Sequence, residues 1–172
     1  MKYQKIYSFD TADGKGIRTS IFVSGCTLHC KNCFNPEAWD FNAGKLFTSK
    51  QFFQILELLK RPYCAGLSIL GGEPFDQIDN DLLIELCKSA HVMGKNVWAW
   101  SGHQFEELLK NDKTHNLLEN CDVLVDGRYD DKLRDLSLAW RGSSNQRVLD
   151  VKESLTQNKP ILYRGLIWKV KK

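Results

Sequence analysis

The sequence lacks a long hydrophobic run, a strong excess of either charge, and any repeat or low-complexity segment. Its longest apolar run is the four residues Val97–Trp100, whereas a membrane-spanning helix needs roughly 20. The net charge of +3, from 24 Lys and Arg against 21 Asp and Glu, is too small and too evenly spread for the electrostatic attraction on which nucleic-acid binding depends. The N-terminal segment MKYQKIYSFD contains no apolar core of a secretory signal. We therefore expect a cytoplasmic protein that binds neither nucleic acid nor a membrane.

The length and composition are those of one globular domain. At 172 residues, with 42% hydrophobic and 26% charged residues, the chain can bury a sizeable core. This composition excludes disorder, collagen and coiled coil. We expect a single domain over residues 1–172.

Short apolar or β-branched runs alternate with segments of helical period. Strands are expected at 19–24, 67–70, 95–100 and 122–125. One helix is expected to begin at Thr48, which forms a capping-box pattern with Gln51. A second helix is expected over 80–92 and is ended by Gly94, and further helix is expected at 104–109 and 117–118. Strands that alternate with helices predict right-handed crossovers, and hence an α/β fold with a parallel sheet.

The loops that follow the four expected strands carry the informative motifs. In parallel sheets, ligands bind beyond the carboxyl ends of the strands, where these loops meet. The four loops begin with Gly25-Cys26, with Gly71-Gly72-Glu73-Pro74, with Ser101-Gly102-His103 and with Asp126-Gly127-Arg128. We expect all four to share one rim.

Half of the six cysteines lie in the first of these loops. Cys26, Cys30 and Cys33 form a C-x3-C-x2-C pattern, and thiols of a cytosolic protein stay reduced. Three thiolates select an iron–sulfur cluster, zinc or cuprous copper. A 4Fe-4S cluster held by three thiolates leaves one iron open, which is typical of a reactive site. A structural zinc would need a fourth ligand such as His29 or Cys64.

The cysteine loop together with the Gly71-Gly72-Glu73-Pro74 motif resembles the radical S-adenosylmethionine superfamily. The resemblance implies a 4Fe-4S cluster on Cys26, Cys30 and Cys33, with S-adenosylmethionine bound at the open iron and cleaved after reduction to a 5′-deoxyadenosyl radical. Glycines at positions 71 and 72 would let the backbone approach a ligand closely, and the Glu73 carboxylate can accept hydrogen bonds from an ammonium group.

Further residues are candidates for binding the cofactor. Asn32 occupies the position before the third cysteine, where many members have an aromatic residue near the adenine, and Phe34 follows that cysteine. Ser101 either hydrogen-bonds the cofactor or starts a helix in a capping box with Gln104. Asp126 and Arg128 resemble a polar pair that holds the cofactor or a nearby cation in glycyl-radical activases, and a surface turn is the alternative.

Six separated segments resemble, more narrowly, the activating proteins of anaerobic ribonucleoside-triphosphate reductase. They include Gly14-x-Gly16-Ile17-Arg18, Cys33-Phe34-Asn35 with Trp39, and Trp140-Arg-Gly-Ser-Ser-Asn-Gln146. The resemblance implies generation of a glycyl radical on the large reductase subunit, with flavodoxin or ferredoxin as electron donor. It also implies an open partial (β/α) barrel, because four strands cannot close an eight-stranded one.

Two other functions fit the same motifs. One is a short radical S-adenosylmethionine enzyme of the deazapurine synthase type, which acts on a small molecule. The other is a zinc-stabilised binding module without catalysis.

The remaining motifs receive structural interpretations or none. Cys64, Cys87 and Cys121 are expected to be core thiols. The loop Arg141–Gln146 is expected near the partner's glycine, and Ile161–Lys172 is expected to form an edge strand or a docking surface. No role is assigned to His29, His103 and His115.

Overall fold

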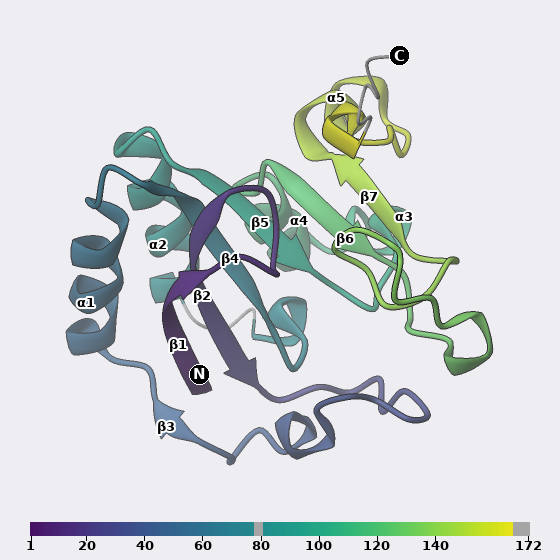
Figure 1. The fold of residues 1–172 in the computed structure, drawn as a ribbon, viewed down its shortest axis with the longest axis horizontal. Helices are drawn as coiled ribbons and strands as arrows, with labels where there is room; N and C mark the ends of the chain where they lie inside the picture. The colour runs from purple at the N-terminus through teal and green to yellow at the C-terminus, as the bar shows by residue number, and fades with distance from the viewer. Residues whose placement is uncertain (78–80, 167–172) are drawn as a thin grey trace.

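A seven-stranded sheet forms the centre of the molecule, in the strand order β3-β1-β2-β4-β5-β6-β7 (Figure 1). The computed structural model describes residues 1–77 and 81–166. The strands are β1 (Lys2–Asp10), β2 (Ile17–Ser24), β3 (Lys45–Leu46), β4 (Cys64–Gly71), β5 (Asn96–Trp100), β6 (Val123–Asp126) and β7 (Arg147–Asp150).

The four inner strands, β2, β4, β5 and β6, confirm the predicted parallel sheet. Each pairs in parallel with the next, and each corresponds to one of the four expected strands. The prediction missed the outer strands β1, β3 and β7, all of which pair antiparallel. β3 has two residues and β7 four, and β1 alternates poorly between apolar and polar residues, so the hydrophobic pattern is weak in all three.

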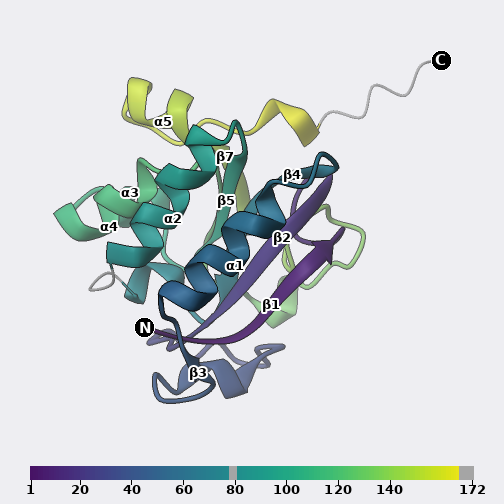
Figure 2. The ribbon, with the colours of Figure 1, turned by 90° about the vertical axis from the view of Figure 1, so that its left-hand side faces the viewer.

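Helices cover one face of this sheet (Figure 2). α1 (Ser49–Leu59) packs on β2 and β4, and α2 (Asp81–Val92) on β4 and β5. Three short helices follow, α3 (Phe105–Leu108), α4 (Asp112–Leu118) and α5 (Val151–Gln157). The predicted capping box is confirmed, because the Thr48 side chain caps α1 and the Thr48 amide donates to Gln51 Oε1 at 3.2 Å.

Strand residues alternate between two different cores. Ile21, Leu67, Ile69 and Ala99 face the helices and belong to the larger hydrophobic cluster. On the opposite face, Trp98, Val123, Val125 and Val148 form a smaller cluster. Successive strand side chains point to opposite faces, so the second face is free to carry a site.

Arg18 is a buried polar residue of β2 that ties this second face together. Its Nε donates to Ser68 Oγ at 2.6 Å, and its guanidinium lies 5.3 Å from the Trp98 ring. Burial lowers the Arg18 pKa to about 10. Ser68 Oγ in turn donates to the carbonyl of Asp13 at 2.6 Å, which fixes the turn between β1 and β2.

The chain after α5 returns to β7. Leu162 forms an isolated antiparallel bridge with Leu149, and Tyr163 N–H donates to Val148 O at 2.8 Å. The predicted edge strand is wrong for the next residues, because Arg164–Leu166 forms the short 3-10 helix η4, and 167–172 lies outside the described residues. No helix in the described ranges has the length and hydrophobicity of a membrane span.

Candidate active site

A pocket of about 810 Å³ lies at the carboxyl ends of the parallel strands. Its lining includes a residue from each of the four loops that follow these strands: Cys26 after β2, Gly72 after β4, Ser101 after β5 and Gly127 after β6. The predicted common rim of the four loops is therefore confirmed.

Cys26, Cys30 and Cys33 all line this pocket. Cys26 is 8% exposed, the other two are half-buried, and none of the three is in a disulfide. The loop turns through left-handed backbone at His29 (φ 46°) and Asn32 (φ 57°). Burial raises the pKa of the Cys26 thiol. Three soft donors facing one pocket fit an iron–sulfur cluster better than a hard cation.

Within the described residues, no set of three or more His, Cys, Asp or Glu side chains is arranged around a single metal ion.

The Gly71-Gly72-Glu73 turn is joined to the start of the cysteine loop through the backbone. Gly72 N–H donates to Val23 O and Glu73 N–H donates to Gly25 O, both at 2.8 Å. A Cβ atom on Gly72 would lie 2.4 Å from Gly25 O. The close approach that requires glycine here is therefore to the protein's own backbone, whereas the sequence analysis attributed it to a ligand.

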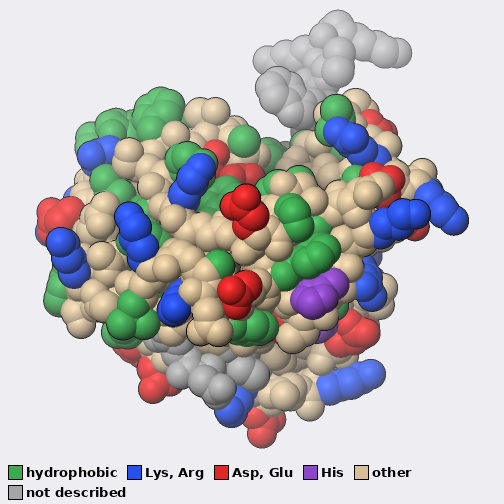
Figure 3. Space-filling model, turned by 90° about the horizontal axis from the view of Figure 1, so that it is seen from below, with side chains coloured by type: hydrophobic (Ala, Val, Ile, Leu, Met, Phe, Trp, Pro, Cys, Tyr) green, Lys and Arg blue, Asp and Glu red, His purple; other side chains and the backbone are tan. Residues whose placement is uncertain are grey.

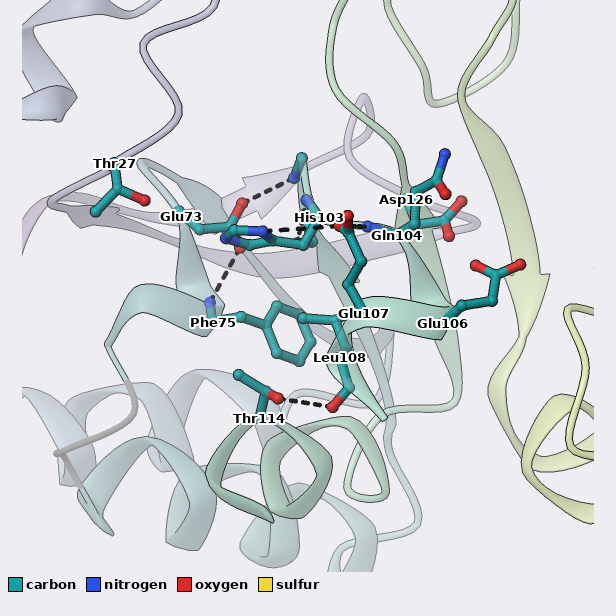
Figure 4. Close-up of polar contacts among 12 residues, drawn as sticks. Thr27, Glu73, Phe75, His103, Gln104, Glu106, Glu107, Leu108, Thr114 and Asp126 are labelled. Atoms are coloured by element: carbon teal, nitrogen blue, oxygen red, sulfur yellow. Dashed lines mark hydrogen bonds and ion pairs between the residues drawn. The ribbon is translucent and has the colours of Figure 1, made fainter. Parts of the chain in front are cut away.

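Glu73 is almost fully buried at 1% exposure, yet it lines the pocket. Its Oε2 accepts from Gly102 N–H at 2.8 Å and its Oε1 from Phe75 N–H at 3.1 Å (Figure 4). Burial raises the Glu73 pKa to about 7. The carboxylate thus links the loop after β4 to the loop after β5.

Asp76, in the short helix η2 (Pro74–Asp76), contacts both neighbouring loops. Its Oδ2 accepts from the amide and the hydroxyl of Thr27, each at 2.8 Å, and its Oδ1 lies 3.2 Å from His103 Nε2. No role was predicted for His103 from the sequence. The structure shows it partly buried in a contact between loops.

Ser101 is buried at the end of β5 and lines the pocket. Its Oγ accepts from His103 N–H at 3.0 Å. The predicted capping box of Ser101 with Gln104 is wrong, because α3 begins only at Phe105 and Gln104 itself is the N-cap, with its amide donating to Glu107 Oε2 at 2.9 Å. A contact between Ser101 and a cofactor stays a prediction.

Asp126 is fully buried and is not among the residues that line the pocket. Its Oδ1 accepts from Arg147 Nε at 2.9 Å and its Oδ2 from Phe105 N–H at 2.8 Å. Arg147 also pairs with Glu106 at 2.8 Å, and both carboxylates lie toward β7 (Figure 4). The surface-turn alternative is therefore wrong for Asp126, and its contacts favour a structural role at the end of β6.

Asn32 and Phe34 both line the pocket, where they form part of its mouth. Asn32 Nδ2 donates to Asp131 Oδ2 at 2.8 Å, and Phe34 is 81% exposed. Arg128 is exposed and its guanidinium donates to Leu28 O. The loop after β6 is therefore hydrogen-bonded to the cysteine loop at both positions.

Other lining residues were not predicted from the sequence, notably Asp13 and Leu136. Burial and the neighbouring Asp10 carboxyl raise the Asp13 pKa to about 7. Asp13 belongs to the turn before β2, which the sequence analysis did not place because β1 was not predicted.

Comparison with known proteins identifies the family. Residues 12–149 match the family described as 4Fe-4S single cluster domain. The chain is 37% identical over 152 residues to the anaerobic ribonucleoside-triphosphate reductase-activating protein of Haemophilus influenzae, with 86% of this chain and 97% of that protein covered. This chain belongs to that family of activating proteins. The Escherichia coli K12 protein of the same name is also 37% identical, with the same coverage, and that of bacteriophage T4 is 34% identical over 150 residues, covering 86% and 93%.

Membership in the activating-protein family agrees with the division of the six cysteines. Cys64, Cys87 and Cys121 are buried in the core, as predicted, and burial raises the Cys87 pKa to about 12. The 4Fe-4S description of the matched domain favours the iron–sulfur interpretation of the other three over zinc.

Proposed function

We propose that this protein activates anaerobic ribonucleoside-triphosphate reductase by generating a glycyl radical on its large subunit. The observation that carries the proposal is the gathering of three free cysteines and a buried glutamate around one pocket, in a chain of the activating-protein family. The whole chain, 1–172, would act as one domain with the architecture of an open partial barrel, since the sheet continues through all seven strands.

Cys26, Cys30 and Cys33 would hold a 4Fe-4S cluster with one iron open, and S-adenosylmethionine would bind beside it. When bound, these groups supply one-electron chemistry: reductive cleavage of S-adenosylmethionine to methionine and a 5′-deoxyadenosyl radical, which abstracts a hydrogen atom from the target glycine. Glu73 would accept a hydrogen bond from the cofactor's ammonium group.

The remaining cofactor contacts would come from Asn32, Phe34 and Ser101 at the pocket, and from the glycine backbone of the Gly71-Gly72 turn. Asp126 would act indirectly, because its carboxylate already accepts hydrogen bonds from Arg147 and from the amide of Phe105, the first residue of α3. Its role would be to hold the end of β6, where Gly127 lines the pocket.

The pocket mouth would admit the partner's glycine segment. Phe34 and Leu136 line the pocket and are each 81% exposed, which is a large apolar area to leave in water. Trp140, Arg141 and Gln146 line the same side, so the loop Arg141–Gln146 would lie near that segment.

An external electron donor of the flavodoxin or ferredoxin class would reduce the cluster. All six cysteines are free thiols, and we propose the reducing cytoplasm as the compartment.

The test is an electron paramagnetic resonance assay with the reductase large subunit. The reconstituted, reduced protein with S-adenosylmethionine should produce a glycine-centred doublet on that subunit. Cleavage of S-adenosylmethionine without this signal would instead indicate a radical enzyme that acts on a small molecule. A colourless protein with zinc and no sulfide would exclude radical chemistry.

A further inference from the structure

Asp76 and His103 form a partly buried contact that the proposed chemistry does not use. The side chains are 13% and 28% exposed, and Asp76 Oδ1 lies 3.2 Å from His103 Nε2. His103 follows β5, and Asp76 follows the glycine-rich turn after β4. The pair therefore joins two of the loops that surround the pocket.

Asp76 extends this link to the cysteine loop. Its second oxygen accepts both the amide and the hydroxyl of Thr27, the residue directly after Cys26. A carboxylate that accepts two donors from one residue fixes the orientation of that residue. The first turn of the cysteine loop is thus attached to His103 through a single side chain.

The backbone on the other side of Cys26 is held as well. Gly25 O accepts from Glu73 N–H at 2.8 Å, and Cys26 N–H donates to Trp39 O at 3.2 Å. The chain is consequently fixed before Cys26 by backbone contacts and after it by Asp76. Loss of the hydrogen bonds to Asp76 would release only the chain after Cys26.

Charge favours this arrangement. The contact with Asp76 raises the His103 pKa. Burial by itself would raise the Asp76 pKa, but hydrogen bonds from His103 and Thr27 lower the Asp76 pKa below its usual value. His103 Nδ1 also lies 4.0 Å from Glu107 Oε2. The imidazole therefore lies between two carboxylates, of which only that of Asp76 is within hydrogen-bonding distance of the ring.

We propose that His103 and Asp76 are positioning residues that hold the first turn of the cysteine loop in the conformation that retains the cluster. The inference rests on the proposed function only in taking Cys26, Cys30 and Cys33 as ligands. It concerns how firmly these residues keep iron, and not the radical reaction.

The chain provides a matched control in a second His–Asp pair. His91 Nε2 lies 2.9 Å from Asp122 Oδ2, and Asp122 also accepts a backbone N–H, that of Val97 at 2.7 Å. Asp122 precedes β6, so this pair lies at the amino end of that strand, whereas His103 follows the carboxyl end of β5.

The experiment compares His103→Ala, His103→Gln and His91→Ala in the full-length, reconstituted protein without S-adenosylmethionine or reductase. The rate of iron release to a chelator is measured, together with hydrogen exchange of the peptide covering 26–33 and the Tm. We expect His103→Ala to release iron about tenfold faster and to exchange faster over 26–33. His103→Gln, which can still donate to Asp76, should lie close to wild type, and His91→Ala should not change iron release.

Equal rates for His103→Ala and wild type, or equal acceleration by His91→Ala, would overturn the inference. A second variant, Thr27→Val, tests the proposal if His103→Ala does not fold, because it removes only the hydroxyl donor to Asp76. Thr27→Val should accelerate iron release by a smaller factor than His103→Ala. An unchanged rate of iron release in Thr27→Val would count against the proposal. Failure of the wild-type protein to assemble a cluster would instead contradict the proposed function.

Discussion

At the scale of single residues, burial separates side chains of the same type into different roles. Cys33 is half-buried and lines the pocket, whereas Cys87 is fully buried among helix and strand residues. A thiol enclosed by apolar atoms is inert, while one that faces a pocket is available as a ligand. Removal of the Cys33 thiol should therefore affect iron binding, and removal of the Cys87 thiol should affect the stability of the fold.

Cys33→Ala should abolish iron binding and leave the fold intact, because the loop lies outside the core. Iron per chain should fall from about four to near zero with little change in the metal-free Tm. The comparison variant Cys87→Ala should keep its iron and lower the free energy of unfolding by about 1 kcal/mol or more. Loss of folding in Cys33→Ala would indicate a structural metal instead.

The buried Glu73 carboxyl predicts a specific pH dependence of stability. Its pKa of about 7 in the folded protein exceeds the ordinary 4.5, so the folded state binds the proton more tightly than the unfolded state. Its contribution is complete below about pH 4.5 and is lost as pH rises through 7, by about 1.4 kcal/mol per unit of pKa difference. In urea unfolding of the metal-free protein, Glu73→Gln should flatten this decline between pH 5 and pH 7.

The control for this measurement is Glu119→Gln, an exposed carboxylate next to α4. Its pH profile should run parallel to that of wild type. If the Glu73→Gln profile also runs parallel, Glu73 is not the group responsible.

At the scale of elements, the end of β4 determines where the cysteine loop begins. The turn after β4 lies against the end of β2, and Gly71 has a φ of 112° with Phe22 and Val23 in contact. The glycines therefore act on the loop by packing, before any ligand binds. The short helix η2 then directs Asp76 back toward the same loop.

Substitution of two glycines should separate packing from backbone strain. Gly72→Ala places its Cβ 2.4 Å from Gly25 O, so the backbone must move; we expect a loss of about 1–3 kcal/mol and reduced iron loading. A Cβ on Gly94 would meet no other atom, so Gly94→Ala is unfavourable only because of the φ of +70°. We expect Gly94→Ala to lower the free energy of unfolding by about 1 kcal/mol and to keep normal iron loading. Normal iron loading in a folded Gly72→Ala would show that this contact does not position the loop.

At the scale of the whole molecule, one face of the protein mixes apolar side chains with both signs of charge. The face seen from below shows apolar, acidic and basic side chains interspersed (Figure 3). A nucleic-acid interface would instead concentrate basic residues on one face. The relatives are named for a protein target, a reductase, and not for a nucleic acid.

Leu136→Ser should weaken binding of the reductase large subunit while leaving the activator's own chemistry intact. Burial of an exposed leucine contributes enough to predict a Kd increase of at least about tenfold. Cleavage of S-adenosylmethionine by chemically reduced protein, measured without reductase, should be unchanged. Val92→Ser, at an 89% exposed position of α2, is the matched control and should leave the Kd unaltered.

An unchanged Kd for Leu136→Ser would place the partner surface elsewhere. A parallel loss of uncoupled S-adenosylmethionine cleavage would mean that Leu136 acts on the pocket itself.

The amino-acid sequence by itself determined the parallel centre of the fold and the identity of the motifs. Strong hydrophobic runs and a capping box mark local structure, so β2, β4, β5, β6 and α1 could be predicted. The cysteine spacing is equally local, and it singled out the three pocket thiols. The antiparallel strands β1, β3 and β7 were not predicted, because β3 and β7 are short and β1 alternates poorly between apolar and polar residues.

Only the tertiary structure decided which side chains act together. The contact between Asp76 and His103 joins positions 27 residues apart, and the one between Asp126 and Arg147 joins positions 21 apart. Neither follows a helix or strand period, so no spacing rule could reveal them. Sequence placed Asp126 at the pocket and left His103 without a role, whereas packing directs the Asp126 carboxylate onto Arg147 and brings His103 into the contacts around the cysteine loop.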